Sequence, residues 1–263
     1  MTKQERLWLA AHALGVSTAG LLACPERMDA PEVRALLQRR EAGEPLQYIL
    51  GEAPFLGRDF RVGPGVLVPR QDTETLITAV RSFFPADASF AFLDWGTGSG
   101  CIAATLLLEF PNSTAILAER SPLAIGYARR NLERYHLENR ASVLKTETPE
   151  DIVMDGECDF VVSNPPYIPT GEIGSLMREV RDYEPREALD GGLDGLDCYR
   201  ALFVQAPRWL KPGGLLILEM GVTAPSDFDP ERFSFVRDFK DGSGFPRCAV
   251  WKCVKYQATA LEL

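Results

Sequence analysis

The sequence contains few of the side chains from which metal sites are built. Of its 263 residues, two are histidine and six are cysteine, and no two cysteines form a Cys-x-x-Cys pair. Zinc sites draw on Cys and His at short spacings, so we expect no metal site. The cysteines are predicted to be small buried side chains in a reducing compartment. His12 and His136, each in a predicted helix, are expected to be structural.

Long apolar runs and basic patches are also missing. No stretch approaches the roughly 20 apolar residues of a membrane span, and the first residues, which include Glu5, lack the apolar centre of a secretory signal. We therefore predict a cytoplasmic protein with no membrane partner. Lys and Arg number 28 against 37 Asp and Glu, a net charge of −9. Duplex nucleic acid repels such a surface, so we expect a small-molecule or protein partner and no direct nucleic-acid binding.

The first third of the chain reads as a small helical domain. Residues 1–42 have the apolar spacing of short helices, one stopping at Gly15 and a second with Pro31 in its first turn. Apolar and polar residues then alternate around Gly57, which is typical of a hairpin. We expect an N-terminal domain over residues 1–82, consisting of helices and a linking β-hairpin.

Strands and helices alternate in the rest of the chain, residues 83–263, which we expect to form a second domain. Near-continuous apolar strands separated by helices predict a parallel α/β sheet covered on both faces. The last two strand-like runs have little helix between them, so the final strand is expected to pair antiparallel. The predicted strands cover residues 89–95, 114–119, 141–145, 159–163, 215–220, 233–239 and 248–254.

A glycine-rich loop follows the first of these strands. Its spacing is Gly-x-Gly-x-Gly, which differs from the Gly-x-Gly-x-x-Gly of dinucleotide-binding loops. Glu119 ends the next strand, where a carboxylate can accept hydrogen bonds from both ribose hydroxyls. The pattern predicts a nucleoside with an amino-acid tail; the alternatives are a glycine turn without function and a surface acid beside Arg120. The predicted ligand-binding residues are Gly96, Thr97, Gly98, Ser99, Gly100 and Glu119.

The predicted strand 159–163 leads into Asn164-Pro165-Pro166-Tyr167 at the same edge of the sheet. Each proline fixes φ at about −65° and lacks an N–H, so the turn is stiff and its carbonyls are free. The Asn164 side-chain oxygen and the Pro165 carbonyl can accept two hydrogen bonds from one NH₂ group, and Tyr167 offers a face for a planar substrate. The alternative is a purely structural turn.

Such a turn suits methyl transfer to a planar amide or amine nitrogen. An amide lone pair is delocalised and attacks poorly, so two fixed acceptors orient the nitrogen and stabilise its developing positive charge. A sulfonium donor supplies the driving force, and the product nitrogen loses its proton to water without a dedicated base. We predict Asn164, Pro165 and Tyr167 as catalytic residues, Asn164 through Tyr167 as the substrate-binding turn, and Asn164 as a further contact to the donor.

Taken together, these residues resemble the N(5)-glutamine methyltransferases of class 1 peptide chain release factors, the PrmC/HemK family. An Asn-Pro-Pro-Tyr turn alone is shared with DNA adenine methyltransferases and other amino-group methyltransferases, so the hairpin and the segment after Tyr167 carry the specificity. The resemblance rests on Gly43 to Gly51, Phe55 with Gly57, Val68-Pro69-Arg70, Thr73-Glu74, the glycine loop, Asn164 to Tyr167, Tyr183-Glu184-Pro185, Ala188-Leu189, Gly191-Gly192 and Asp194 to Asp197.

The resemblance implies a class I S-adenosylmethionine-dependent methyltransferase with a Rossmann-like, seven-stranded, mostly parallel sheet and an antiparallel last strand. It implies S-adenosyl-L-methionine as the donor and the glutamine of a release factor Gly-Gly-Gln loop as the acceptor, held by Asn164 and Pro165. The N-terminal domain would help to grip this protein substrate. The segment from Pro69 to Glu74 would help to wall the site, although Arg70 and Glu74 could instead form a solvated ion pair.

Other functions remain open at this point. The acceptor could be a glutamine of a ribosomal protein or an adenine in nucleic acid, although the net charge of −9 disfavours the latter. A non-catalytic, donor-binding interaction module is an alternative of a different class. A nicotinamide-dependent oxidoreductase is disfavoured by the glycine spacing.

Overall fold

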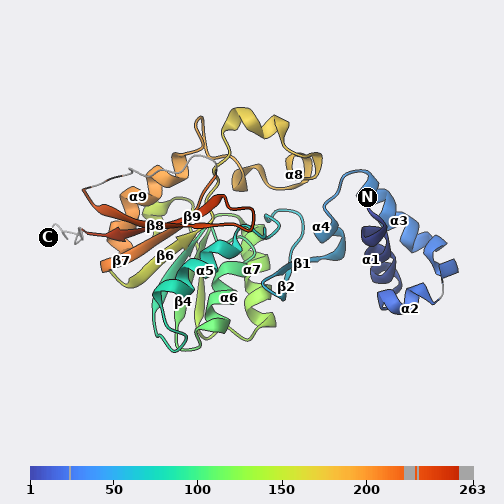
Figure 1. Ribbon diagram of the computed structural model, residues 1–263, viewed down its shortest axis with the longest axis horizontal. Coiled ribbons are helices and arrows are strands. Elements are labelled where there is room, and N and C mark those ends of the chain that lie inside the picture. The colour runs from blue at the N-terminus through green and yellow to red at the C-terminus, as the bar shows by residue number, and fades with distance from the viewer. Residues whose placement is uncertain (24, 222–228, 230, 255–263) are drawn as a thin grey trace.

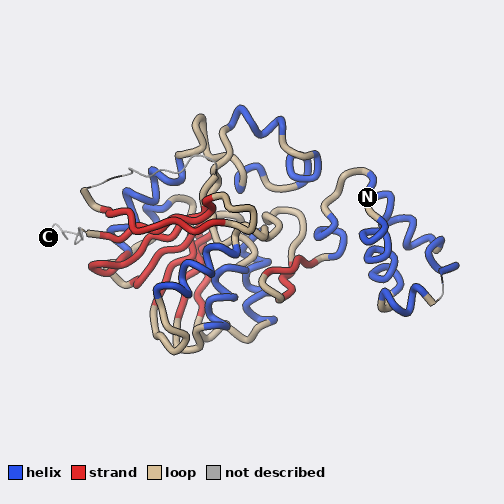
Figure 2. Tube along the Cα trace, viewed as in Figure 1, coloured by secondary structure: helices blue, strands red, loops and turns tan. Residues whose placement is uncertain are grey.

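The computed structural model describes residues 1–263 except residues 24, 222–228, 230 and 255–263. A group of helices near the N-terminus stands apart from a large α/β part, and a short hairpin runs between them (Figures 1 and 2). Among the described helices, none combines the length and apolar character that crossing a membrane requires.

The N-terminal helices pack around a small apolar core of their own. The first helix begins with a capping box between Thr2 and Glu5, in which each side chain accepts from the other's backbone N–H. It ends at Gly15 in the left-handed conformation, as the sequence predicts. Pro31 lies in the first turn of a later helix, also as predicted. The elements are α1 (Lys3–Leu14), α2 (Thr18–Leu22), the 3₁₀ helix η1 (Pro25–Asp29), α3 (Pro31–Glu41) and α4 (Leu46–Leu50).

The predicted hairpin forms, but it is shorter than the alternating sequence suggested. Strands β1 (Glu52–Phe55) and β2 (Arg58–Arg61) pair antiparallel around the turn at Gly57. The chain then runs irregularly to α5 (Glu74–Phe83) and buries Val62, Val66 and Val68, which explains the apolar alternation there without a strand. Helix α4 precedes the hairpin and was not among the helices that the sequence predicted.

All seven predicted strands form one sheet, in the order β5-β4-β3-β6-β7-β9-β8. The last strand, β9, pairs antiparallel with both neighbours, and the other neighbouring pairs are parallel. This confirms the mostly parallel sheet with an antiparallel last strand. The strands are β3 (Ala91–Trp95), β4 (Thr114–Glu119), β5 (Ala141–Lys145), β6 (Cys158–Ser163), β7 (Leu210–Glu219), β8 (Phe233–Lys240) and β9 (Pro246–Cys253).

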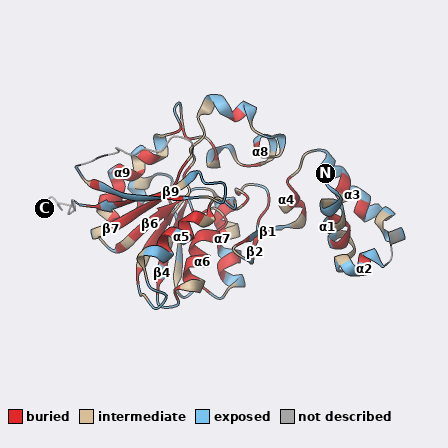
Figure 3. Cartoon of the chain, in the orientation of Figure 1, coloured by how far each residue is buried: buried red, intermediate tan, exposed pale blue. Residues whose placement is uncertain are grey.

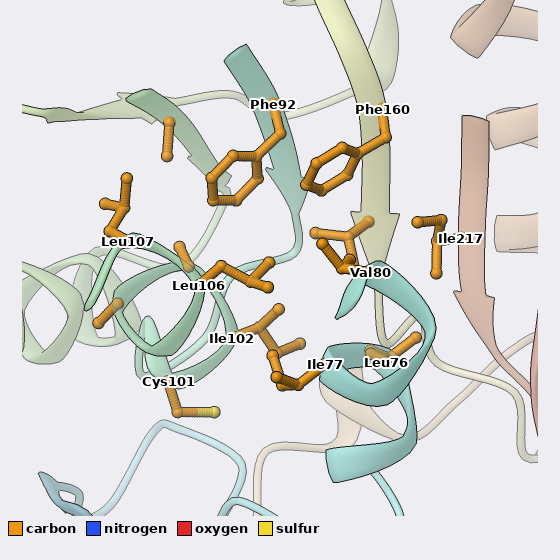
Figure 4. Close-up of a cluster of buried hydrophobic side chains, with 14 of the residues drawn as sticks. Leu76, Ile77, Val80, Phe92, Cys101, Ile102, Leu106, Leu107, Phe160 and Ile217 are labelled. Atoms are coloured by element: carbon orange, nitrogen blue, oxygen red, sulfur yellow. The ribbon is translucent and has the colours of Figure 1, made fainter. Parts of the chain in front are cut away.

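Helices cover both faces of the sheet, so its central strands are buried (Figure 3). On one face α5, α6 (Cys101–Glu109) and α7 (Pro122–Arg134) share an apolar cluster with Phe92 and Phe160, whose rings stack with centroids 4.9 Å apart (Figure 4). On the other face α9 (Asp197–Trp209) packs on the alternate residues of the same strands. This explains why the strands read as continuous apolar runs.

The long connection from β6 to α9 forms a lobe that the strand–helix pattern did not predict. It contains the 3₁₀ helices η3 (Thr170–Ser175) and η4 (Arg186–Ala188) and the helix α8 (Arg178–Tyr183); a further 3₁₀ helix, η2 (Pro149–Asp151), precedes β6. The lobe contacts the N-terminal helices, because Arg40 pairs with Glu179 at 2.7 Å and the Tyr183 hydroxyl donates to the Ala42 carbonyl at 3.2 Å. The lobe therefore lies against the N-terminal helices.

Candidate active site

A cavity of about 660 Å³ opens where the parallel strands end. Its wall includes the glycine loop after β3, Glu119 at the end of β4 and Asn164 after β6. The segment before α5 and the lobe close other sides, through residues 65–73 and 185–190. This is the edge at which open α/β sheets bind ligands.

The glycine loop turns sharply because its three glycines adopt positive φ. The angles are 69° at Gly96, 57° at Gly98 and 78° at Gly100, values that side chains with a Cβ rarely tolerate. A Cβ at Gly100 would also lie 3.3 Å from the Cα of Ala128, where α6 packs against α7. The positive φ angles confirm the sharp turn that the glycine spacing predicted, and the close packing of α6 on α7 is an addition from the structure.

Asp94 anchors this loop from below. It is fully buried, and its Oδ2 accepts from the Thr97 hydroxyl at 2.6 Å and from the Ala103 amide at 3.2 Å. Burial raises the pKa of Asp94 to about 7, and these two hydrogen bonds oppose the rise. The carboxyl thus ties the loop to the first turn of α6.

Glu119 is held rigidly against the cavity. Its Oε2 accepts from the Gly98 amide at 2.9 Å, and its Oε1 accepts from the amides of Arg120 and Ser121 at 2.8 and 2.9 Å. The residue is 8% exposed and lines the cavity. It is therefore not a surface acid paired with the Arg120 side chain, which was the alternative interpretation.

Asn164 enters the cavity wall directly after β6. Its Nδ2 donates to the Thr73 hydroxyl oxygen at 3.1 Å, and no donor from the described part of the chain reaches its Oδ1. Pro166 also lines the cavity, whereas Pro165 is buried beside it. The Pro165 carbonyl has no backbone N–H partner among the residues that the structure describes.

Tyr167 points away from the cavity wall. Its hydroxyl donates to Glu219 Oε1 at 3.2 Å, and its ring packs on the core beneath α9. A Cβ at Gly221 would lie 2.9 Å from the ring, so this glycine makes room for it. In this arrangement Tyr167 braces the Asn-Pro-Pro turn from behind.

Glu184 fixes the segment before α5, a role that the sequence interpretation did not assign to it. The Arg70 guanidinium pairs with Glu184 of the lobe at 2.6 Å, and the Val68 amide donates to the same carboxylate at 3.3 Å. Burial raises the pKa of Glu184, while Arg70 opposes the rise. An ion pair between Arg70 and Glu74 does not form, because the Glu74 Oε1 accepts from the Leu56 amide at 3.1 Å instead.

The segment from Pro69 to Glu74, which the resemblance implied as a wall of the site, does line the cavity in part. Pro69, Arg70 and Thr73 line it, while Glu74 does not. Among the described residues, no cluster of three or more His, Cys, Asp or Glu side chains could hold a metal ion. Glu219 also had no role in the sequence interpretation. Its signal in the sequence is an acid directly after the apolar run 215–218 that ends β7.

Solved structures share this architecture. A methyltransferase from Pyrococcus furiosus superposes with a TM-score of 0.52 at 19% identity, over 84% of this chain and 97% of that one. A T. thermophilus 16S rRNA N2 G1207 methyltransferase, solved with AdoMet and guanosine, gives a TM-score of 0.53 at 18% identity, over 77% of this chain and 49% of that one. The fold is that of the S-adenosylmethionine-dependent methyltransferases.

Sequence comparison narrows this class to one family. Residues 3–51 match the PrmC N-terminal domain and residues 72–179 match the methyltransferase small domain. The release factor glutamine methyltransferase of Geobacter sulfurreducens is 45% identical over 222 residues, which are 83% of this chain and 76% of that protein. The release factor glutamine methyltransferase of Koribacter versatilis is 38% identical over 247 residues, which are 90% of this chain and 86% of that protein. The chain belongs to the release factor glutamine methyltransferases.

Proposed function

We propose that the protein transfers a methyl group from S-adenosyl-L-methionine to the side-chain amide nitrogen of the glutamine in the Gly-Gly-Gln motif of class 1 peptide chain release factors. The names of the relatives support this substrate. One observation carries the chemistry: Asn164 lies in the cavity wall with its Nδ2 bonded to Thr73, which leaves Oδ1 for the NH₂ group of a substrate amide.

The donor site comprises Gly96 to Gly100, Glu119 and Asn164. The cavity of about 660 Å³ lies within the size range of cofactor sites. Three backbone amides already hold the Glu119 carboxylate in place. It can therefore accept hydrogen bonds from the ribose hydroxyls without losing side-chain entropy on binding. When bound, S-adenosyl-L-methionine supplies a methyl group on a sulfonium leaving group.

The chain's own residues orient the substrate nitrogen. Asn164 Oδ1 and the Pro165 carbonyl accept the two amide protons, and Pro166 and Tyr167 keep the turn in position. Both acceptors stabilise the positive charge that develops on the nitrogen. That nitrogen becomes acidic after transfer and releases its proton to water, so no histidine base is required.

The two parts of the chain divide recognition and chemistry. We assign substrate recognition to residues 1–82, the helices and the hairpin, and methyl transfer to residues 83–263. The lobe contact through Arg40 and Glu179 supports a shared surface beside the cavity. Because release factors act on ribosomes, we also propose a cytoplasmic location.

The test is to incubate the protein with isotopically labelled methyl donor and purified class 1 release factors and to locate the label by peptide mass spectrometry. We expect it on the Gly-Gly-Gln glutamine, with none on a release factor in which this glutamine is replaced by glutamate. Ribosomal proteins and DNA, offered in parallel, should stay unlabelled. Label on either of them, with none on the release factor, contradicts the proposal.

A further inference from the structure

A buried polar contact lies behind Asn164. Thr73, which is 2% exposed, occupies the N-cap position of α5, yet its side chain makes no capping hydrogen bond. Its oxygen instead accepts from Asn164 Nδ2 at 3.1 Å. A threonine at this position ordinarily caps its own helix, so the hydroxyl has been diverted toward the active site.

Glu219 lies on the far side of this hydroxyl, at the end of β7. It is fully buried, its Oε1 accepts from the Tyr167 hydroxyl at 3.2 Å, and its backbone carbonyl accepts from the Tyr199 hydroxyl at 2.8 Å. Helix α5 packs directly on β7, with Leu76 facing Ile217 (Figure 4). Neighbouring elements therefore bring Thr73 and Glu219 together from distant parts of the chain.

No hydrogen bond between the Thr73 hydroxyl and the second carboxylate oxygen of Glu219 is present in the described structure, so this link is inferred from the proton that Thr73 has left to donate. Burial raises the pKa of Glu219 to about 7, and hydrogen bonding with the Thr73 and Tyr167 hydroxyls opposes the rise. Oε2 nevertheless has no donor in strict hydrogen-bond geometry among the described residues. We take Thr73 as its donor, because the single Thr73 proton has no other acceptor within the described part of the chain.

The direction of these hydrogen bonds is set by elementary bonding capacity. A hydroxyl has one proton and two lone pairs, an ionised carboxylate only accepts, and an Asn amide has a donor end and an acceptor end. If the Thr73 hydroxyl donates its proton to Glu219, the Thr73 oxygen can only accept a hydrogen bond from Asn164. The Asn164 amide must then point its Nδ2 toward Thr73. If the Asn164 amide were flipped, its Oδ1 would need the Thr73 hydroxyl proton. The buried Glu219 carboxylate would then lose that proton as a hydrogen-bond donor.

We propose that Glu219 is a positioning residue that, through Thr73, fixes the amide of Asn164 with its oxygen toward the substrate. The same carboxylate holds Tyr167, so it braces the Asn-Pro-Pro turn at both ends. The identity of the substrate amide rests on the function proposed above, whereas the orientation of Asn164 does not.

We call the hydrogen-bond chain from Glu219 through Thr73 to Asn164 the relay. Two nearly isosteric variants interrupt it at different points. Glu219→Gln offers one acceptor oxygen where two hydroxyls now donate, and Thr73→Val removes the hydroxyl without removing a helix cap. Measured as single-turnover methyl transfer to a release factor at about pH 8, where Glu219 is ionised, each should slow the reaction by about tenfold or more. Binding of S-adenosyl-L-methionine should stay within about twofold, since neither side chain contacts the donor in this account.

A double-mutant cycle separates the relay from two independent defects. The Glu219→Gln/Thr73→Val protein should be no more than about twofold slower than the worse single variant. Thr73→Ser should restore most of the rate. Thr105→Val, the same substitution at a buried threonine of α6 outside the site, should leave the rate unchanged. Multiplicative losses in the double variant would overturn the proposal.

A spectroscopic readout keeps this test independent of the substrate. In ¹⁵N-labelled protein, the Asn164 side-chain amide resonances, assigned by their loss in Asn164→Ala, should shift in both Thr73→Val and Glu219→Gln and stay in place in Thr105→Val. Unchanged resonances in Glu219→Gln contradict the relay. If the wild-type protein labels no release factor while these shifts occur, the proposed function fails and the relay stands.

Discussion

Asn131 joins the glycine loop to the hairpin, because its Nδ2 donates to the Ser99 carbonyl at 2.8 Å. The same Nδ2 donates to the Arg61 carbonyl at 3.0 Å, and Oδ1 accepts from the Arg61 amide at 2.7 Å. The residue is fully buried in α7. One side chain thus satisfies three backbone groups and couples β2 to the glycine loop.

Replacing Asn131 with alanine should lower the free energy of unfolding by about 2–4 kcal/mol, because the buried Ser99 carbonyl and the partly buried backbone groups of Arg61 lose these partners. The measurement is denaturant unfolding, with donor affinity determined in parallel. Asn112→Ala, at an exposed asparagine, is the control and should change stability by less than about 0.5 kcal/mol. Equal stabilities of the two variants would contradict the bracing role.

Replacing Glu119 with alanine should weaken binding of S-adenosyl-L-methionine by about 1–3 kcal/mol, the scale of lost charge-assisted hydrogen bonds. Isothermal titration calorimetry measures this directly. The matched control is Glu109→Ala, at the far end of α6, which should bind the donor like the wild type. A wild-type affinity in the Glu119 variant would remove this residue from the donor site.

Gly100→Ala should destabilise the protein by about 1–3 kcal/mol, because φ is 78° and the new Cβ would press on the Ala128 backbone at 3.3 Å. Thermal unfolding is the readout. Gly171→Ala meets no atom within 4 Å and has no positive φ, so it serves as the control and should be neutral. Comparable melting temperatures for the two variants would mean that the loop tolerates a side chain at Gly100.

The pH dependence of stability should change in Glu219→Gln. The pKa of Glu219 is raised from 4.5 to about 7, mainly by burial, so the folded state holds a proton that the unfolded state has lost. The stability of the wild type relative to the variant should therefore fall as pH rises through this window, by about 3 kcal/mol, and level off above it. Urea unfolding of both proteins between these pH values measures this difference.

Other groups that act on Glu219 do not alter that sign. Arg247 lowers its pKa and Asp72 raises it, both less than burial does. Asp94 titrates in the same window but is present in both proteins, so its contribution cancels in the difference. A pH-independent difference would show that Glu219 is already ionised at low pH.

Local patterns in the sequence sufficed for most of the fold. The strand runs, the stop at Gly15 and the start of α3 at Pro31 each depend on a few neighbouring residues, and such local signals are retained in the folded protein. The lobe between β6 and α9 could not be predicted in this way. It is held by distant contacts, such as Arg70 with Glu184, that no local period reveals.

The same division applies to the site. The glycine loop and Glu119 follow directly from their places after β3 and at the end of β4, because parallel strands bring their ends to one edge. The environment of Tyr167 could not be inferred, since its partner Glu219 is 52 residues away in the chain. Which end of the Asn164 amide faces the cavity likewise depends on Thr73, 91 residues earlier.

The most direct test of the account is the single-turnover rate of Asn164→Ala together with its affinity for S-adenosyl-L-methionine. Removing the Asn164 oxygen takes away an acceptor for the substrate amide while the loop and Glu119 stay in place. We expect methyl transfer to a release factor to fall by at least about a hundredfold. Donor affinity should fall by far less, because Asn164 is one of several proposed donor contacts and the others remain. Wild-type turnover in this variant would contradict the account.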